Sequence, residues 1–254
     1  MDDPTVALSI VLPCYNESGN LPNIYAVLSE ILQAHPGVEV LLVNNGSTDS
    51  SDTVFADLQK THTLPIRVVA VEKNQGYGHG ILTGVRAAQG TFIAWSHADM
   101  QTDPRDILAA YERLTQSADP ERTVMKGKRK NRPLLDEFFT SGMAWLSSVA
   151  LGQWLHDINA QPKLFPRSFL TVLDNAPADF SLDLFFLYEA KKRGYTLLEQ
   201  DVVFGKREHG EAKGGGTMKG KLKLIKRTLA YIFELRRRLR EPSPPPNPRP
   251  AGGQ

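Results

Sequence analysis

The sequence predicts an α/β protein with a mostly parallel central sheet flanked by helices. Short apolar runs rich in β-branched residues alternate with segments of helical periodicity through the first half of the chain, and polar stretches follow the apolar runs. Strands that alternate with helices at this spacing form βαβ units and a parallel sheet. The 254 residues, 41% of them hydrophobic, are sufficient for one large domain with a buried core.

Four strands are expected in the first half of the chain. Residues 7–12 read Ala-Leu-Ser-Ile-Val-Leu and stop at Pro13, and comparable apolar runs occupy residues 38–43, 66–71 and 92–95. Continuous apolar character over so few residues is typical of strands that are covered on both faces. We therefore expect residues 7–12 and 38–43 to be buried strands, and residues 66–71 and 92–95 to be the third and fourth strands of the sheet.

Helical periodicity appears between and after these strands. The segments expected as helices are residues 21–34, a stretch around 54–58 that Ser47 or Thr48 can cap, 81–88, 106–114, 138–154 and 180–192. Beyond residue 114 the alternation weakens: residues 124–133 are expected as a strand followed by a basic loop, and 202–204 as a last strand. Residues 219–240 are expected as a basic amphipathic helix, and the Pro/Gly-rich residues 241–254 as a disordered tail.

Polar segments follow the ends of all four early strands. They are residues 13–17, 44–49, 72–80 and 97–103. Ligands of an open parallel sheet bind beyond the carboxyl ends of its strands. We therefore expect these four segments to share one rim of the sheet, and their convergence is the main indication of a ligand site.

The fourth polar segment suggests a metal site. Ser96 to Asp103 combines carboxylate, imidazole and amide groups directly after a buried strand. Such a cluster can hold a divalent cation that neutralises the diphosphate of a bound nucleotide. Taken alone, the same residues are explained by a solvated acidic turn. The metal interpretation is strengthened by the three upstream segments, which indicate the same ligand.

The first two polar segments offer groups that bind nucleotides. Tyr15 can stack on a base or ribose, and Glu17 can accept hydrogen bonds from ribose hydroxyls. Asn44 and Asn45 can read the edge of a base through their amides. A turn with a capping side chain explains either segment about as well.

The third polar segment contains Gly76-Tyr77-Gly78-His79-Gly80. A dinucleotide-binding fingerprint would follow the first strand, with an acidic residue about twenty positions further on. Here the glycines follow the third strand, so a flexible turn that approaches a ligand is the better interpretation. Glu72 and Asn74 beside it are candidate nucleotide contacts.

Composition restricts where the protein works. The formal net charge of +2 does not indicate a nucleic-acid partner, and Cys14 is the single cysteine, so no intrachain disulfide is expected. Met1-Asp2-Asp3-Pro4 lacks the basic start of a signal peptide. No apolar run approaches the roughly 18 residues that a membrane span requires. We expect a cytoplasmic protein, or one that touches a membrane from the cytoplasmic side.

Taken in order, the motifs resemble the family 2 glycosyltransferases, enzymes of the GT-A fold that use nucleotide-sugar donors. The matching residues are Pro13-Cys14-Tyr15-Asn16-Glu17, Asn44-Asn45-Gly46-Ser47-Thr48-Asp49, Asn74-Gln75-Gly76 and Ala98-Asp99-Met100-Gln101. Within the family, the chain looks most like the polyprenyl-phosphate branch, whose members include dolichyl-phosphate mannose synthase-like enzymes. The resemblance implies a GT-A domain over residues 5–215, followed by the basic helix within 216–240 and the tail at 241–254.

Two departures from the family pattern affect the donor site. Asn44 stands where a carboxylate is usual, and His97 replaces the first Asp of the metal motif. The resemblance implies Asp99 as the carboxylate ligand beside Ala98, with Gln101 and His97 as further donors and the donor diphosphate supplying the rest. The expected cofactor is Mg²⁺ or Mn²⁺. His97 favours Mn²⁺ of the two, because imidazole suits Mn²⁺ better than Mg²⁺. The expected donor is a GDP- or UDP-sugar.

The acceptor side that the resemblance implies is cationic. The phosphate-facing groups are expected to be Arg129, Arg132, Lys163, Arg207 and Lys213. Arg129 and Lys163, together with Asp99, are the expected catalytic residues. A phosphate monoester is already an anion at neutral pH and attacks without a general base, whereas a hydroxyl acceptor needs a positioned carboxylate.

Three functions follow from these observations. The first is inverting transfer of a hexose from a nucleotide-sugar to a polyprenyl phosphate. The second is transfer to a hydroxyl group, with Asp183 or Asp179 as the base. The third is a non-catalytic nucleotide-sugar binder, suggested by His97 and Asn44 in place of the usual acids.

The last predicted helix bears on location. Leu222, Ile225, Leu229 and Ile232 form one apolar stripe, and nine basic residues lie between positions 219 and 240. Such a helix suits peripheral binding to the anionic inner face of the cell membrane. A helix that packs on the domain and solvates its basic face explains the pattern about as well.

Overall fold

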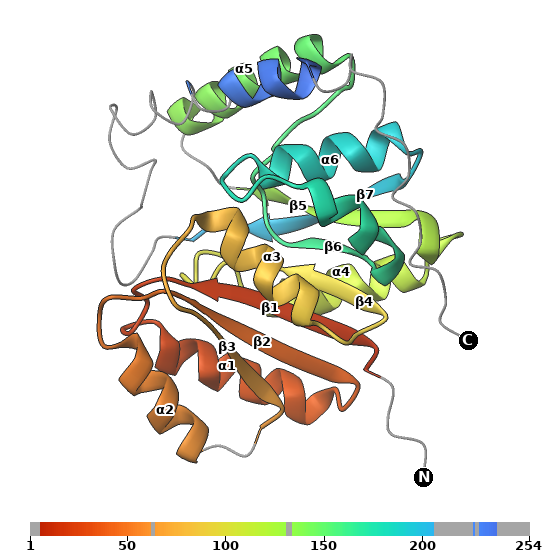
Figure 1. The fold of residues 1–254 in the computed structure, drawn as a ribbon. Coiled ribbons are helices and arrows are strands. Elements are labelled where there is room, and N and C mark those ends of the chain that lie inside the picture. The colour runs from red at the N-terminus through yellow and green to blue at the C-terminus, as the bar shows by residue number, and fades with distance from the viewer. Residues whose placement is uncertain (1–5, 62–63, 131–133, 206–225, 227–228, 238–254) are drawn as a thin grey trace, which may run out of the picture.

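The computed structural model describes residues 6–61, 64–130, 134–205, 226 and 229–237. At its centre is a seven-stranded sheet in the order β3-β2-β1-β4-β6-β5-β7 (Figure 1). The strands are β1 (Leu8–Cys14), β2 (Val38–Asn45), β3 (Ile66–Val71), β4 (Phe92–Trp95), β5 (Thr123–Lys130), β6 (Lys163–Pro166) and β7 (Thr196–Val203). Only β6 among these runs antiparallel to its neighbours. The predicted α/β fold with a mostly parallel sheet is confirmed.

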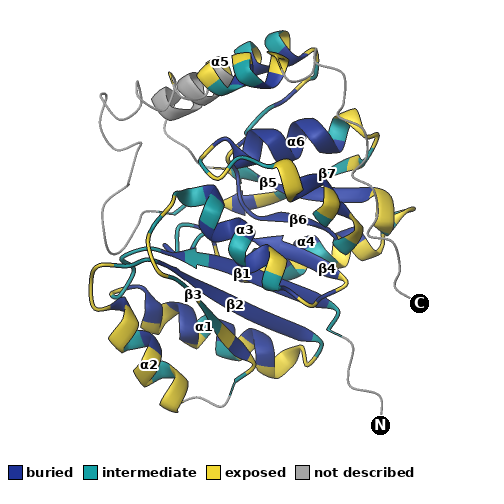
Figure 2. Ribbon diagram, viewed as in Figure 1, coloured by how far each residue is buried: buried dark blue, intermediate teal, exposed yellow. Residues whose placement is uncertain are grey.

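Helices cover both faces of the sheet. They are α1 (Leu21–Ala34), α2 (Ser51–Thr61), α3 (Tyr77–Ala87), α4 (Arg105–Thr115), α5 (Leu134–Leu151) and α6 (Leu182–Lys192), with short 3₁₀ segments η1 (Pro120–Arg122) and η2 (Arg167–Asn175). Leu28, Phe55 and Ile107 bury α1, α2 and α4 against one face, and Ile81 and Phe186 bury α3 and α6 against the other. Figure 2 shows β1, β2 and β4 dark blue between these two layers.

The start of α3 differs from the prediction. The helix begins at Tyr77, so Gly78 and Gly80 are helical residues and do not form a flexible turn. A Cβ atom on Gly78 would lie 2.7 Å from backbone atoms of residues 177–179, and one on Gly80 would lie 2.7 Å from the Asn45 side chain. The glycines are therefore needed for close packing of α3 and not for backbone freedom.

The basic segment and the last strand also differ from the prediction. The last strand, β7, begins at Thr196, whereas we expected residues 202–204. Lys126 to Lys130 belong to β5 and pair in parallel with β7, whereas we expected a basic loop. The strand β6 was not predicted, because its four residues carry no periodicity of their own. None of the described helices combines the length and the apolar character of a membrane span.

Part of the predicted C-terminal helix is described. Residue 226 and residues 229–237 are helical. Ile232 and Leu235 are buried in the hydrophobic cluster that also contains Leu151 and Leu155. This stretch of helix thus packs on the α3 and α6 side of the molecule, while Leu222 and Ile225 lie outside the described residues.

Candidate active site

The loops after β1 and β2 are hydrogen-bonded to each other. The Thr48 backbone N–H donates to Asn16 Oδ1 at 2.7 Å, the Asn16 N–H donates to Ser47 Oγ at 3.1 Å, and the Glu17 N–H donates to Ser51 Oγ at 3.2 Å. Asn16 has a φ of 56°, a left-handed conformation that asparagine tolerates better than most residues. This conformation lets both its side chain and its backbone contact the second loop.

The candidate nucleotide contacts of the first loop lie at this junction. Pro13, Tyr15 and Glu17 are all partly exposed. Glu17 Oε2 accepts a hydrogen bond from Asn20 Nδ2 at 2.6 Å, which holds the carboxylate near the start of α1. The rim therefore presents an aromatic ring and an oriented carboxylate, as a ribose or base contact requires.

Asn44 and Asn45 lie at the end of β2 and point to opposite faces of the sheet, as successive strand residues must. Asn44 donates from Nδ2 to Asp52 Oδ1 on α2, and its Oδ1 accepts the Ser47 N–H at 3.1 Å. Asn45 donates from Nδ2 to the Gly76 carbonyl at 3.0 Å. The second loop is thus tied to α2 on one face and to the third loop on the other.

The third and fourth loops meet through aromatic rings. Tyr77 stacks on His97 with ring centroids 5.6 Å apart, and on Phe180 at 4.9 Å. Asn74 Oδ1 accepts the Gly76 N–H at 2.9 Å, while Glu72 next to it is exposed. The four polar segments therefore share one rim, as predicted.

The fourth loop holds Asp99 in a fixed position. Its side chain is 4% exposed, and Oδ1 accepts the Gln101 backbone N–H at 3.1 Å. Met100, between them, has a φ of 56°, a strained conformation for a side chain of this size. The Gln101 Nε2 donates to the Gly205 carbonyl at 3.3 Å, so the segment after β7 also reaches this loop.

The donor set fits a cation that is shared with a substrate. Among the residues that the structure describes, no group of three or more His, Cys, Asp or Glu could form a protein cage for a metal. Mg²⁺ is commonly bound by one or two carboxylates together with substrate phosphates. Asp99, with the partly exposed His97 and Gln101 beside it, matches that kind of site.

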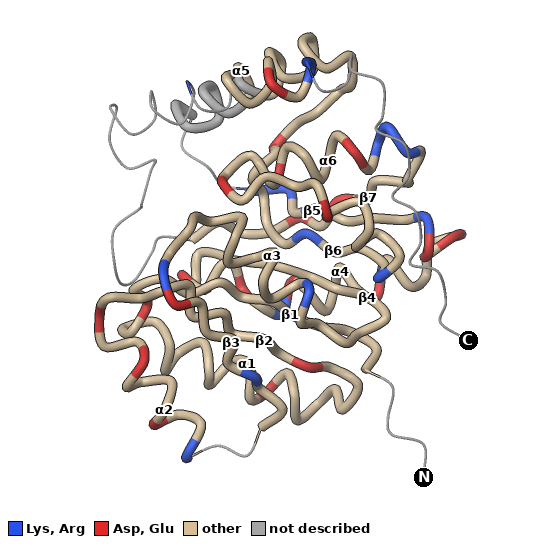
Figure 3. The backbone as a smooth tube through the Cα atoms, viewed as in Figure 1, with Lys and Arg blue, Asp and Glu red and all other residues tan. Residues whose placement is uncertain are grey.

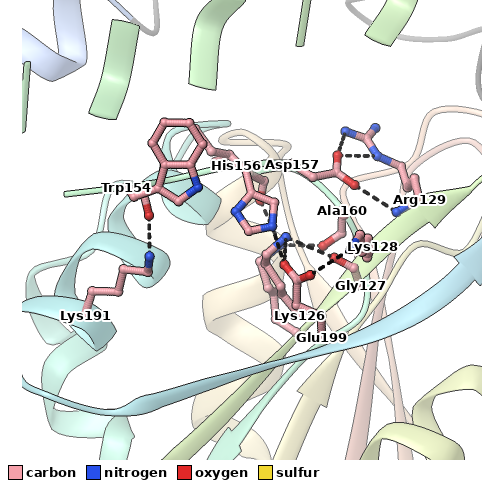
Figure 4. Close-up of polar contacts among 12 residues, drawn as sticks. Lys126, Gly127, Lys128, Arg129, Trp154, His156, Asp157, Ala160, Lys191 and Glu199 are labelled. Carbon is pink, nitrogen blue, oxygen red and sulfur yellow. Dashed lines mark hydrogen bonds and ion pairs between the residues drawn. The ribbon is translucent and has the colours of Figure 1, made fainter. Parts of the chain in front are cut away.

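The cations of β5 are paired with acids. Lys126 is fully buried, and its Nζ lies 2.9 Å from Oε1 of Glu199 on β7, while the Lys128 Nζ lies 3.4 Å from Oε2 of the same residue. Lys130 lies 3.3 Å from Asp201. Figure 3 shows these charges along the two strands, and Figure 4 shows the cluster around Glu199. The parallel pairing of β5 with β7 thus neutralises much of the basic segment.

Arg129 is held by Asp157. Its Nε donates to Asp157 Oδ1 at 2.9 Å and its backbone N–H to Oδ2 at 2.8 Å, and the guanidinium lies 5.5 Å from the centre of the Phe204 ring (Figure 4). Although burial opposes ionisation, the hydrogen bonds and charge of Arg129 lower the pKa of Asp157. Asp157 adopts a φ of 41° to make this pair.

Lys163 and Asp183 form a buried pair. The Lys163 Nζ donates to the carbonyls of Ile158 and Ala160 at 2.9 and 2.6 Å and lies 3.2 Å from Asp183 Oδ1. Burial lowers the pKa of Lys163, and the negative charge of Asp183 partly offsets this. The ammonium group is therefore surrounded by three protein oxygens.

Tyr77 links this pair to the rim. Its hydroxyl donates to Asp183 Oδ2 at 3.2 Å, while Gln161 Nε2 donates to Asp183 Oδ1 at 2.9 Å. Burial, and then the charge of Asp183, raise the pKa of Tyr77 well above its usual value. Both Asp183 oxygens are thus engaged, and the residue is 2% exposed.

Sequence reasoning missed Tyr77, Asp157 and Glu199. Tyr77 was taken as part of a turn, and its position at the start of α3 could have been indicated by the helical spacing of the residues that follow it. The role of Glu199 depends on the register of β5 with β7, and the role of Asp157 depends on the conformation of the loop between α5 and β6. No local pattern encodes either. Arg132, Arg207 and Lys213 lie outside the described residues.

The order of the sheet and the helices on both of its faces match the GT-A fold of solved glycosyltransferases. The chain belongs to the family described as "Glycosyl transferase family 2", whose sequence model matches residues 9–143.

Comparisons with individual proteins agree with this assignment. The chain is 29% identical over 221 residues to an uncharacterized glycosyltransferase of Mycobacterium tuberculosis. The match covers 85% of this chain and 93% of the relative. It is 25% identical over 226 residues to the polyprenol monophosphomannose synthase of Mycolicibacterium smegmatis, with 84% and 83% covered.

Solved structures show the same fold. A mannosyltransferase from Pyrobaculum calidifontis, in complex with GDP-Man and Mn²⁺, has a TM-score of 0.64 at 19% identity, covering 96% of this chain and 68% of that one. Glucosyl-3-phosphoglycerate synthase from Mycobacterium tuberculosis has a TM-score of 0.68 at 18% identity, with 93% and 80% covered.

Proposed function

We propose that this glycosyltransferase transfers a hexose, with inversion, from a GDP- or UDP-sugar to a polyprenyl phosphate at the inner face of the membrane. The observation that carries the proposal is the joining of four loops at one rim around Asp99. The similarity to a polyprenol monophosphomannose synthase over most of both chains supports the choice of acceptor.

The donor nucleotide lies against the first three loops in this proposal. The contacting residues are Pro13, Tyr15, Glu17, Asn44, Asn45, Glu72 and Asn74, with Ala98 under the diphosphate. Asp99, Gln101 and His97 hold Mg²⁺ or Mn²⁺. When bound, the cation supplies positive charge that stabilises the departing nucleoside diphosphate.

Arg129 is the acceptor contact that the geometry supports best. Asp157 engages its Nε and Nη2 atoms, so further donors of the guanidinium can reach an anionic phosphate. Arg132, Arg207 and Lys213 complete the cationic site in the proposal. Lys163, which we expected to face the phosphate, is enclosed by protein oxygens, so its role in this proposal is structural.

Transfer to a hydroxyl is disfavoured by the same geometry. A general base must reach the proton that it removes. Asp183 is 2% exposed and holds Lys163, Gln161 and Tyr77 with its two oxygens, and Asp179 Oδ1 accepts the Ser181 N–H at 2.9 Å. An anionic phosphate acceptor needs neither residue as a base.

The test is a transfer assay with the full chain, Mn²⁺, labelled GDP- and UDP-hexoses and undecaprenyl phosphate, with lipid-linked sugar as the readout. Asp99→Asn is expected to lower turnover by at least about 100-fold, the scale of losing one transition-state charge contact. Asp57→Asn, which changes an exposed carboxylate on α2, is the matched control and is expected to keep full activity. Full activity of Asp99→Asn, or no lipid product with any donor, would contradict the proposal.

Asp183→Asn separates the two acceptor classes. Little change in turnover is expected when a lipid phosphate is the acceptor, provided that the variant keeps its thermal stability. Turnover of the wild type with a sugar hydroxyl, abolished by Asp183→Asn without loss of donor binding, would instead support the hydroxyl route.

A further inference from the structure

Tyr77, at the start of α3, contacts two parts of the candidate site at once. Its ring stacks on the His97 ring at a centroid distance of 5.6 Å, with 23° between the planes. Its hydroxyl donates to Asp183 Oδ2 at 3.2 Å and accepts a hydrogen bond from Gln161 Nε2 at 3.0 Å. One side chain therefore joins the loop after β4, which carries the proposed metal ligands, to the buried pair of Lys163 and Asp183.

Tyr77 is itself held in place. Its ring stacks on Phe180 at 4.9 Å, with 7° between the planes. The backbone around it packs against the segment before α6, because the His79 N–H donates to the Ala178 carbonyl at 2.8 Å and a Cβ atom on Gly78 would lie 2.7 Å from backbone atoms of that segment. The plane of the Tyr77 ring is thus fixed through its hydroxyl, its face and its backbone.

The orientation of its ring decides whether a histidine can bind a metal. A carboxylate offers two equivalent oxygens, so it can reach a cation from several directions. An imidazole binds through one nitrogen, along a line that lies in the plane of the ring. Partners that fix the ring of a ligand in the correct orientation change metal affinity by about 10–100-fold. Because His97 stands where the family pattern has an aspartate, this chain needs an orienting contact that a carboxylate does not need.

We propose that Tyr77 is a positioning residue that orients His97 as a metal ligand and thereby makes the site prefer Mn²⁺ over Mg²⁺. Because the two rings are stacked, the plane of Tyr77 sets the plane in which the metal-binding nitrogen of His97 lies. Imidazole suits Mn²⁺ better than Mg²⁺, so the preference between these two cations depends on that nitrogen. The inference rests on the proposed function, in which Asp99, Gln101 and His97 hold the cation.

Asp99 and His97 are oriented by different parts of the molecule. Asp99 is 4% exposed, and its Oδ1 accepts the Gln101 N–H at 3.1 Å, a contact within its own loop. His97 is partly exposed, and its ring stacks on a residue of α3, outside that loop. A change at Tyr77 is therefore expected to disturb His97 and to leave Asp99 in place. The preference for Mn²⁺ would be lost, while the binding of Mg²⁺ through Asp99 would remain.

The experiment measures Mn²⁺ binding to the full chain by electron paramagnetic resonance (EPR), in which the signal of free Mn²⁺ falls as the ion binds. Titrations use Mn²⁺ alone and Mn²⁺ with GDP or UDP, against the nucleotide without protein, and Mg²⁺ is the competitor. Tyr77→Leu removes the stacked ring and is expected to weaken Mn²⁺ binding at least about tenfold, with little change in Mg²⁺ binding. Tyr77→Phe keeps the ring and is expected to bind both ions as the wild type does.

The decisive comparison uses His97→Asp, which places the carboxylate of the family pattern at this position. Because a carboxylate has no ring to orient, adding Tyr77→Leu to His97→Asp is expected to leave Mn²⁺ affinity unchanged. Equal losses from Tyr77→Leu in the wild type and in the His97→Asp background overturn the proposal, since Tyr77 would then act on the rim as a whole. Tyr111→Leu is the matched control and is expected to bind Mn²⁺ normally, because this partly buried tyrosine packs on Phe92 in the other hydrophobic cluster.

Pulsed EPR of the bound Mn²⁺ tests the contact with His97 directly. A nitrogen ligand adds a hyperfine modulation, which is expected for the wild type and Tyr77→Phe and is expected to be lost in Tyr77→Leu. Bound Mn²⁺ without this modulation in the wild type overturns the proposal. If melting curves show that Tyr77→Leu does not fold, Tyr77→Met takes its place, because a flexible methionine fills the space without a ring.

The role of Tyr77 and the proposed function fail separately. Nitrogen modulation that depends on Tyr77, without any lipid-linked product in the transfer assay, would refute the proposed reaction and leave the role of Tyr77 intact. Sugar transfer by a wild type whose bound Mn²⁺ shows no nitrogen modulation would refute the role of Tyr77 alone. A wild type that binds no Mn²⁺, with or without a nucleotide, would refute both the metal site and the role of Tyr77.

Discussion

At the scale of single residues, Asn44 shows how this chain manages without the carboxylate that the family usually has at this position. Its side-chain amide accepts a hydrogen bond from the Ser47 N–H and donates one to Asp52. A carboxylate therefore still lies at the end of β2, but it belongs to Asp52 on α2. An amide is required here, because only a group with both a donor and an acceptor can make these two contacts.

Asn44→Asp is therefore expected to destabilise the protein, although it restores the more usual residue. The change removes the donor to Asp52 and places two carboxylates in contact, at a cost of about 1–2 kcal/mol near pH 7. Thermal unfolding at pH 7.5 and pH 4 is the measurement, and the loss is expected to shrink at pH 4, where carboxylates take up protons. The double change Asn44→Asp/Asp52→Asn restores a donor and an acceptor and is expected to recover most of the stability. Equal losses in the single and double variants would contradict this explanation.

The Arg129–Asp157 pair makes a second prediction at this scale. Since the folded state lowers the pKa of Asp157, the unfolded state binds more protons between the two pKa values, and stability rises with pH in that range. The contribution is complete above the ordinary carboxyl pKa and is lost as the pH falls through the lowered one. Asp157→Asn is expected to remove this acid dependence and to cost about 3 kcal/mol at pH 7, because Arg129 is left buried without its partner.

Urea unfolding between pH 2.5 and 7 measures the effect. The control is Asp201→Asn, which breaks the pair with Lys130 on the surface and is expected to cost less than about 1 kcal/mol. If the free energy of unfolding of Asp157→Asn fell as steeply at low pH as that of the wild type, other carboxylates would account for the acid dependence.

At the scale of elements, α3 depends on close approach to the segment before α6. Gly78→Ala would place a methyl group 2.7 Å from backbone atoms of Pro177, Ala178 and Asp179, and it is expected to destabilise the protein by about 1–3 kcal/mol. Gly142→Ala on α5 is the matched control, since nothing lies within 4 Å of its Cβ position, and a helical glycine replaced by alanine gains about 0.5–1 kcal/mol. Melting temperatures of the two variants are expected to move in opposite directions. A rise of the melting temperature in both variants would mean that helix propensity, and not packing, governs the site at Gly78.

The sequence predicted the N-terminal elements closely and the C-terminal ones less well. The bounds of strands 66–71 and 92–95 and of the helix 21–34 match the structure, because the strands are short apolar runs and the helix has a strong helical period. The strand β6 and the start of β7 at Thr196 were missed. Their residues are placed by pairing with strands far away in the chain, and such contacts leave no local signal.

The candidate site was likewise predicted in part. The four rim loops were predicted because the ends of parallel strands meet at one edge whatever the side chains are. The ion pairs of Arg129 and Lys163 could not be predicted, since their partners Asp157 and Asp183 depend on loop conformation and on the packing of α6. Cationic side chains that look like ligand contacts in a sequence can therefore be held by buried acids in the fold.

At the scale of the whole molecule, donor binding is expected to stabilise the folded chain through all four loops at once. A ligand at 100 times its Kd adds about 2.7 kcal/mol of stability. Mn²⁺ together with a GDP- or UDP-sugar is expected to raise the melting temperature more than the sum of the separate effects, because the cation and the diphosphate share Asp99. Asp99→Asn is expected to abolish the part of the melting-temperature shift that exceeds this sum, and Asp57→Asn is expected to keep it. Purely additive shifts in the wild type would argue against a shared cation.

The burial of Lys126 against Glu199 has a consequence for synthesis of the chain on the ribosome. Lys126 occupies the interior of β5, yet its counter-charge lies on the final strand, more than seventy positions later. Until that strand emerges, an ammonium group would have to be desolvated without compensation, which is strongly unfavourable. The nascent polypeptide can assemble its first four strands early, but the half of the sheet formed by β5, β6 and β7 has to wait for β7. A nonsense mutation before Thr196 would therefore leave that half of the sheet unable to fold and would not just remove a peripheral extension.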